Sequence, residues 1–102
     1  MTVQITLSEK QLRFLRARAH ALKPVLQIGQ QGVTAGVCAE AERALHDHEL
    51  IKVRIQAAER AARDQLIAEL VERTASALVQ RIGHIAVLFK RRPGFSRLPL
   101  PD

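Results

Sequence analysis

The chain has 102 residues, a length that fits one compact domain with a single core. Hydrophobic residues make up 47% and charged residues 25%, as in an ordinary soluble protein, and three Phe with neither Trp nor Tyr argue against an aromatic platform for stacking bases. The net charge of +6 gathers at the two ends, since residues 1–28 carry five cationic side chains against one acidic one, and residues 90–102 carry four against one.

Segregated positive charge on a small domain is typical of a protein that binds a polyanion, with nucleic acid the first candidate and an anionic membrane second. A merely solubilising surface is the alternative. The single cysteine, Cys38, suits a reducing compartment. Residues 1–8 have no basic start followed by an apolar run, and Pro, Gly and Gln interrupt the longest uncharged stretch, 24–39. We therefore expect a cytoplasmic protein with no membrane partner.

The first helix is predicted from Glu9 to His20, because Ser8-Glu9-Lys10-Gln11 matches a capping box. At 100° per residue one side of this helix is apolar and an adjoining stripe is basic. The apolar side holds Leu12, Leu15, Ala19 and Leu22, and the basic stripe holds Lys10, Arg13, Arg16 and His20. The stripe is either a solvated helix face or a contact surface for RNA.

Pro24 forces Lys23 out of the helical region, and Val25 to Ile28 is predicted to be a short strand. A second helix is expected over 35–48, with Thr34 as its N-cap. Leu50 to Ile55 alternates strictly, which places Lys52 and Arg54 on the face of a strand that points away from the core.

A third helix is predicted over 59–75, with Glu59/Arg63 and Glu69/Arg73 as surface ion pairs. Two strands, 77–82 and 84–89, flank Gly83 and are expected to form an antiparallel hairpin. The order α-β-α-β-α-β-β predicts an α/β fold with three helices and a mixed four-stranded sheet. Helical connections favour right-handed crossovers and parallel pairing among the first three strands, and the last hairpin adds an antiparallel strand.

One domain is therefore expected over 1–89, followed by a basic, flexible C-terminal tail over 90–102. This tail is either an arm that orders on RNA, with Phe95 as a lone stacking residue, or a frayed polar terminus. We see no internal repeat.

Residues Gly29, Gln30, Gln31 and Gly32 connect the first strand to the second helix. A glycine-edged loop before a helix N-terminus suits a phosphate, because glycines let the backbone approach closely and the first turn presents N–H groups without helical partners. A tight connection without a ligand is the alternative, since G-x-x-G alone is a weak motif.

An ordered series of short motifs surrounds this loop. The motifs are Leu22-Lys23-Pro24, Ile28-Gly29-Gln30-Gln31-Gly32-Val33-Thr34, Ala44-Leu45 and His48-Glu49-Leu50-Ile51-Lys52-Val53. Over residues 8–89 the chain thereby resembles the CRM domain family, in particular its stand-alone bacterial, YhbY-like members. The resemblance implies a fold similar to the C-terminal domain of bacterial initiation factor three.

The same resemblance implies an RNA-binding domain associated with precursors of the large ribosomal subunit. We expect it to act as a monomer on structured ribosomal RNA. Multi-domain plant relatives assist intron splicing, so a general RNA chaperone or splicing role is an alternative. The loop glycines of the family fall on Gly29 and Gly32, and its lysine before proline falls on Lys23. Because both central loop residues are Gln, positive charge is expected from Lys23, the first helix and the pair Lys52 and Arg54.

A protein-interaction module with an incidental basic surface is the competing function, and an enzyme is a distant third. His46 and His48 diverge on a helix and do not predict a metal site. Cys38 has neither a paired cysteine nor an evident base. We therefore expect no catalysis, no metal and no cofactor.

Overall fold

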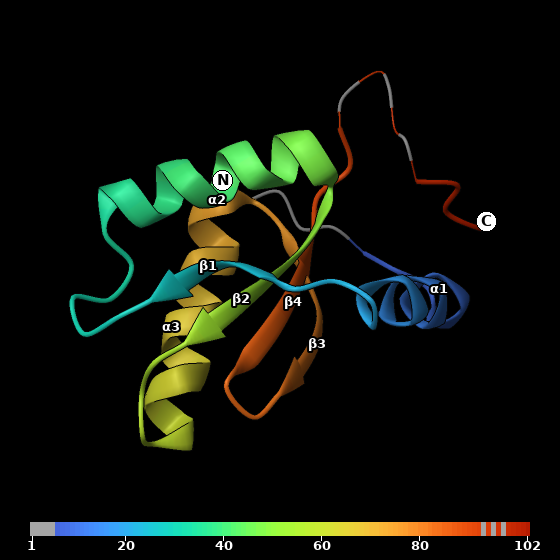
Figure 1. Cartoon of the computed structure of the whole chain (residues 1–102). Helices are drawn as coiled ribbons and strands as arrows, with labels where there is room; N and C mark the ends of the chain where they lie inside the picture. The colour runs from blue at the N-terminus through green and yellow to red at the C-terminus, as the bar shows by residue number, and fades with distance from the viewer. Residues whose placement is uncertain (1–5, 93, 95, 97) are drawn as a thin grey trace.

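The structure is a computed structural model that describes residues 6–92, 94, 96 and 98–102. Three helices and one four-stranded sheet follow one another in the predicted order (Figure 1). Phe95, the predicted stacking residue of the tail, and Arg97, one of its cations, lie outside the described residues. The elements are α1 (Glu9–Ala19), β1 (Pro24–Ile28), α2 (Ala35–His48), β2 (Leu50–Ile55), α3 (Arg60–Thr74), β3 (Ala77–Ile82) and β4 (Ile85–Phe89).

The sheet has the strand order β1-β2-β4-β3. β1 and β2 are parallel, while β4 pairs antiparallel with both β2 and β3. The three strands that follow helices therefore point the same way, as predicted. The expected parallel pairing holds for β1 with β2 but was wrong for β2 with β3, because the hairpin strand β4 lies between those two and pairs antiparallel with both.

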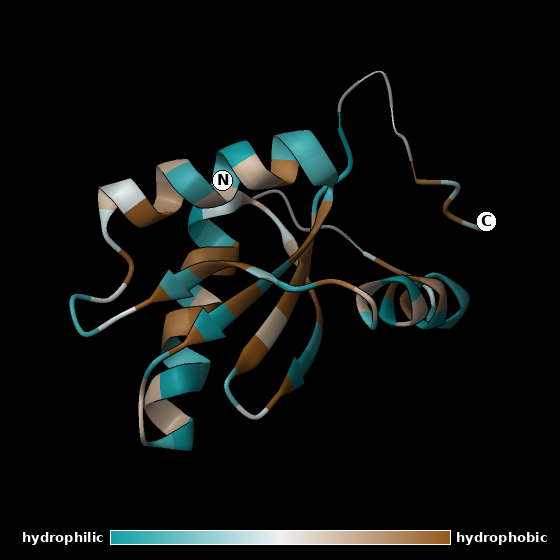
Figure 2. Cartoon of the chain, in the orientation of Figure 1, coloured by the Kyte–Doolittle hydropathy of each residue, from teal (hydrophilic) through white to brown (hydrophobic). Residues whose placement is uncertain are grey.

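Side chains on the two faces of the sheet form two separate cores. One face packs against α2 and α3 through residues such as Ile28, Ile51 and Val53. The other packs against α1 through Leu15 and Ala19, which meet Leu50, Val79, Val87 and Phe89. We call this second surface the α1-side face. Hydrophobic residues gather on the strands and on the inner sides of the helices (Figure 2).

Local signals explain most helix ends. The predicted capping box is present, because the Ser8 side chain accepts from the Gln11 N–H and the Gln11 side chain accepts from the Ser8 N–H. Thr34 caps α2 by accepting from the N–H of Val37 at 3.1 Å. α3 ends at Thr74, and its C-cap residue Ala75 has a left-handed conformation with φ of 52° and ψ of 41°. Within the described part of the chain, no helix is long and apolar enough to cross a membrane.

Two local predictions were wrong. Leu22 was assigned to the buried side of the first helix, but the helix stops at Ala19 and the Leu22 side chain is 37% exposed. Arg63 does not pair with Glu59 in the described contacts, because its Nη1 donates to the carbonyls of Ala57 and Ala58 at 2.9 and 2.8 Å. The other predicted pair is present, with Arg73 Nη1 3.3 Å from Glu69 Oε2.

The predicted flexibility of the tail over 90–102 stays a prediction, but its described residues contact the domain. Arg92 donates from its side chain to the carbonyls of His46 and Asp47 at the end of α2. The buried carboxylate of Glu49 accepts from the Arg92 N–H at 3.0 Å and from Ser96 Oγ at 2.7 Å. Leu98 and Leu100 pack against the core under α1. These contacts connect the tail to helices on both sides of the sheet.

Candidate nucleic-acid interface

The glycine loop, Gly29 to Gly32, is a turn that leaves β1 and leads into α2. The N–H of Gly32 donates to the carbonyl of Gly29 at 3.1 Å, which closes the turn, and the N–H of Thr34 donates to the carbonyl of Gly32. Gln30 and Gln31, the two central residues, are exposed. The loop therefore presents two amide side chains to solvent, and the glycines at its two edges are half-buried.

Gly29 and Gly32 differ in whether the local backbone conformation requires a glycine. Gly32 has a φ of +76°, a left-handed conformation that costs an L-residue roughly 1–2 kcal/mol. Gly29 has no such φ, and a Cβ built on it would meet nothing within 4 Å. The fold itself therefore explains Gly32 but does not explain Gly29, whose half-buried backbone has open space where a side chain would stand.

The first turn of α2 follows the loop at once. Thr34 Oγ1 satisfies the N–H of Val37, and the N–H of Cys38 makes the first helical bond, to the carbonyl of Thr34. The N–H groups of Ala35 and Gly36 precede that bond, so they have no acceptor within the helix. Such groups, with the partial positive charge of a helix N-terminus, favour an anion.

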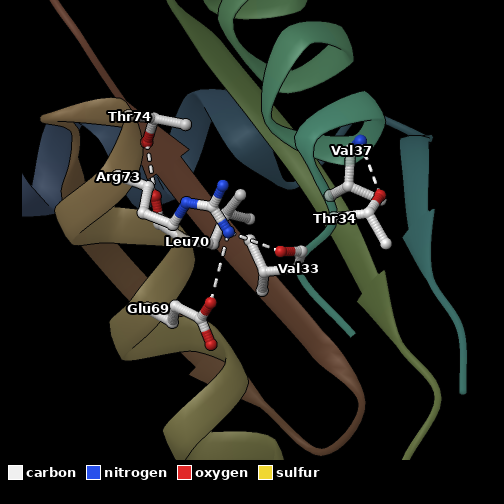
Figure 3. Close-up of polar contacts among 7 residues, drawn as sticks. All are labelled: Val33, Thr34, Val37, Glu69, Leu70, Arg73 and Thr74. Carbon is white, nitrogen blue, oxygen red and sulfur yellow. Dashed lines mark hydrogen bonds and ion pairs between the residues drawn. The ribbon is translucent and has the colours of Figure 1, made fainter. Parts of the chain in front are cut away.

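Helix α3 contacts the residue that follows the loop through the side chain of Arg73 (Figure 3). Arg73 Nη1 donates to the carbonyl of Val33, the residue after the loop, at 2.5 Å and also contacts Glu69. The side chain of Leu66 lies 3.5 Å from where a Cβ on Gly32 would stand. The N–H of Gln56 donates to the carbonyl of Ile28 at 2.9 Å. Contacts on both sides therefore fix the entry and the exit of the loop.

Arg54 is the predicted cationic residue whose strand position is nearest to the loop. It lies beside Gln27 in the pairing of β2 with β1, and Gln27 precedes the loop by one buried residue, Ile28. Both side chains are exposed and point to the α1-side face, because their neighbours along each strand point into the other core. Lys52 lies two residues back on the same face and is half-buried.

α1 covers only part of the α1-side face. Lys10, Arg13 and Arg16 are exposed on it, and Arg16 lines a groove beside Lys52. Figure 1 shows the glycine loop and α1 at opposite sides of the molecule. The α1 cations are therefore connected to the loop through Lys52 and Arg54, and they do not surround it.

Lys23 lies away from the glycine loop. It is exposed just before β1 begins, and the loop starts after β1 ends. Five strand residues separate the two, a span of roughly 16 Å. Lys23 instead lines a mainly apolar cleft with Arg18 and His48.

Charge is partitioned between the layers of the molecule. The four strands, all within the described residues, contain neither Asp nor Glu, and their cations on the α1-side face are Lys52 and Arg54. Arg81 of β3 is on the other face, where its Nε lies 2.8 Å from Asp64 Oδ1. From Lys10 to Ala39 the sequence also has no acidic residue. The acids Glu40, Glu42 and Asp47 lie on α2, and Asp64, Glu69 and Glu72 lie on α3. The strand residues of the α1-side face are therefore cationic, whereas six of the ten acidic residues of the chain lie on α2 and α3 in the opposite layer.

Sequence reasoning missed two features of this surface. It assigned Arg73 only to a surface ion pair. The hydrogen bond to Val33 joins residues 40 positions apart, so no short sequence pattern indicates it. It also passed over Gln27, whose alternation with the buried Leu26 and Ile28 could have placed it on the same face as Arg54. The described residues contain no group of three His, Cys, Asp or Glu side chains arranged to hold a metal ion.

Comparison with known proteins decides the family. The model of the CRS1 / YhbY (CRM) domain matches residues 7–90, nearly the whole chain. The chain belongs to the CRS1 / YhbY (CRM) domain family. A Haemophilus influenzae protein named as RNA-binding is 49% identical over 85 residues, which cover 83% of this chain and 86% of that protein.

Two further relatives agree with this assignment. A probable RNA-binding protein of Pseudomonas aeruginosa is 45% identical over 89 residues, covering 87% of this chain and 86% of its own. A Staphylococcus aureus RNA-binding candidate, known from its solution structure, superposes with a TM-score of 0.80 at 33% identity. That superposition covers 94% of this chain and 100% of the other. The predicted fold class and family are thereby confirmed.

Proposed function

We propose that this chain is a non-enzymatic RNA-binding protein that holds the sugar-phosphate backbone with its glycine loop and the cationic α1-side face. One observation carries the proposal. Gly29, with open space where a side chain would stand, follows the end of β1. There β1 pairs with the part of β2 that carries Arg54 and Lys52, on a sheet face without acidic strand residues. Relatives named for RNA binding support the same class of ligand.

The proposed ligand is ribosomal RNA in a precursor of the large ribosomal subunit, a target that rests on the family resemblance. The protein would act there as a monomer in the cytoplasm, and a single half-buried cysteine suits that compartment. Crosslinking in cells followed by sequencing of the attached RNA tests the target. Enrichment of intron or messenger RNA would instead favour a splicing or chaperone role.

Affinity would come from neutralised phosphates and backbone N–H contacts, and the shape of the RNA would set the selectivity. For about four to six neutralised phosphates, log affinity should fall with log salt concentration with a slope of about −3 to −5. Fluorescence anisotropy of a labelled RNA between 50 and 300 mM salt, roughly the range where such slopes are measured, gives this slope. A flat response contradicts the proposal.

Substitution of Gly29 tests the loop without disturbing the fold. Because a Cβ at this position meets nothing within 4 Å, Gly29→Asn and Gly29→Asp should keep the circular dichroism and melting temperature of the wild type. Both should weaken RNA binding, and Asp more than Asn, since Asp adds a repelled charge. Gly32→Asp is less informative because its φ of +76° adds backbone strain. Unchanged binding by both Gly29 variants would exclude the loop as the site.

Pull-down after nuclease treatment separates RNA binding from the competing protein-interaction function. Partners bridged by RNA should disappear from the nuclease-treated sample, and a direct protein partner should remain. Retention of a single stoichiometric protein after treatment would favour the interaction module.

A further inference from the structure

A groove lies between the C-terminal half of α1 and the part of the α1-side face that α1 leaves open. Its volume is about 270 Å³, and side chains from α1, β2, β3 and β4 line it. We call it the α1–sheet groove. It is separate from the glycine loop, which contributes none of its lining.

Apolar side chains form the floor of the groove. Val87 and Ile85 of β4 share this face with Ile82, because Ile82 pairs directly with Ile85. Ile82 is 63% exposed, the largest exposed fraction among the large hydrophobic residues of the described chain. A flat apolar surface of this kind accepts the face of a planar ring.

A β-bulge brings a polar side chain onto the same floor. The register of β3 with β4 shifts between Leu78 and Gln80, so Gln80 pairs with Val87 while the adjacent Val79 is buried under α1. Strict alternation would have sent Gln80 to the opposite face. Its amide can donate and accept at once, which suits the edge of a base.

The wall of the groove is cationic. Arg16 and His20 come from α1 and the turn after it, and Lys52 comes from the neighbouring strand β2. No acidic side chain is among the residues that line the groove. Cationic groups beside an apolar floor and an amide match a nucleotide, whose phosphate, base face and base edge need these three kinds of partner.

We infer that the α1–sheet groove is a nucleotide subsite that takes one unstacked nucleotide of a single-stranded RNA segment. The base lies against Ile82 and Ile85 with its edge at Gln80, and the phosphate lies between Arg16 and Lys52. The inference rests on the proposed RNA-binding function and adds to it a preference for unpaired RNA. In a duplex the bases are stacked and their faces cannot reach this floor.

The position of the groove fits a strand that also occupies the glycine loop. Lys52 and Arg54 follow one another on the same face of β2, and Arg54 lies beside Gln27 at the approach to the loop. An RNA backbone that leaves the loop can therefore follow these two cations to Arg16.

Replacement of Ile82 by Phe gives a gain-of-function test. An aromatic ring on the floor should raise the affinity for a labelled eight-nucleotide single-stranded RNA by about five-fold or more, because bases stack on aromatic rings more strongly than on aliphatic ones. Leu78→Phe is the matched control, since Leu78 is exposed on the same strand but pairs with Leu88 on the opposite face. Equal gains in both variants, or none in Ile82→Phe, would overturn the subsite.

Replacement of Gln80 by Leu tests the base edge. It should weaken single-stranded binding about three- to ten-fold with an unchanged salt slope, while Arg16→Gln should reduce the slope by about 0.7. For a duplex of the same sequence, Arg16→Gln should lower the binding affinity more than Gln80→Leu does. Melting temperatures of all variants establish that each is folded.

The failure of this inference can be distinguished from failure of the proposed function. Suppose the wild type binds RNA with a steep salt slope and Gly29→Asp weakens it, but Ile82→Phe and Gln80→Leu leave single-stranded affinity unchanged. Then the subsite is wrong and the function stands. Titration with AMP alone is the final experiment. An affinity for AMP equal to that for the oligonucleotide would assign the groove to a free nucleotide and overturn the inference.

Discussion

Replacement of Arg73 by Gln tests whether α3 holds the glycine loop in its observed shape. Arg73 Nη1 donates to the carbonyl of Val33 at 2.5 Å and contacts Glu69 at 3.3 Å. A hydrogen bond from a charged donor contributes about 1.5–3 kcal/mol, and the lower end applies because the Arg73 side chain is 42% exposed. We expect the free energy of unfolding to fall by about 1–2 kcal/mol, which lowers Tm by roughly 5–10 °C.

Glu69→Gln is the matched control for this effect. It removes the ion pair but leaves the contact between Arg73 and Val33. Because an exposed i,i+4 pair contributes about 0.3–0.5 kcal/mol, this variant should lose no more than that. Urea denaturation of both variants measures the difference. Equal losses, within about 0.3 kcal/mol, would mean that the Val33 contact contributes nothing.

Binding measurements then separate a positioning role of Arg73 from a direct phosphate contact. Arg73→Gln should weaken RNA binding with an unchanged salt slope, because its guanidinium is engaged by Val33 and Glu69. Arg54→Gln should weaken binding and reduce the slope by about one. Exchange of the Gly32 amide, which closes the turn, should be faster in Arg73→Gln. A reduced slope in that variant would refute the positioning role.

Three further predictions concern the framework around the site. Ala75→Gly should stabilise the protein by about 0.5–1 kcal/mol in urea denaturation, because Ala75 has a left-handed φ of 52°, and a loss would contradict that conformation. Thr34→Ala should cost about 1 kcal/mol by removing the cap of α2, whereas Thr34→Ser should cost much less. Deletion of residues 93–102 should cost about 2 kcal/mol, because Leu98 and Leu100 leave the core under α1; an unchanged Tm would instead support a flexible tail.

The sequence by itself determined the elements of this protein. Helix α2 occupies Ala35–His48 and strand β2 occupies Leu50–Ile55, both as predicted. The capping box at Ser8 and the alternation of Lys52 and Arg54 were also read correctly. These signals are local, since a cap bonds to a residue three positions away and strand alternation needs only neighbouring residues.

The motif series around Gly29 and Gly32 likewise predicted the family, because its order along the chain is a property of the sequence. Whether these two glycines contact RNA stays a prediction.

Only the tertiary structure decided which of the candidate residues lie together. The position of β4 between β2 and β3, and the placement of α1 over part of one face, leave Arg54 and the floor around Ile82 open. Lys23, close to the loop in sequence, lies a whole strand away from it, and Arg73 reaches Val33 across 40 residues. Packing energies of side chains far apart in the chain set these arrangements, and no short stretch of sequence contains them.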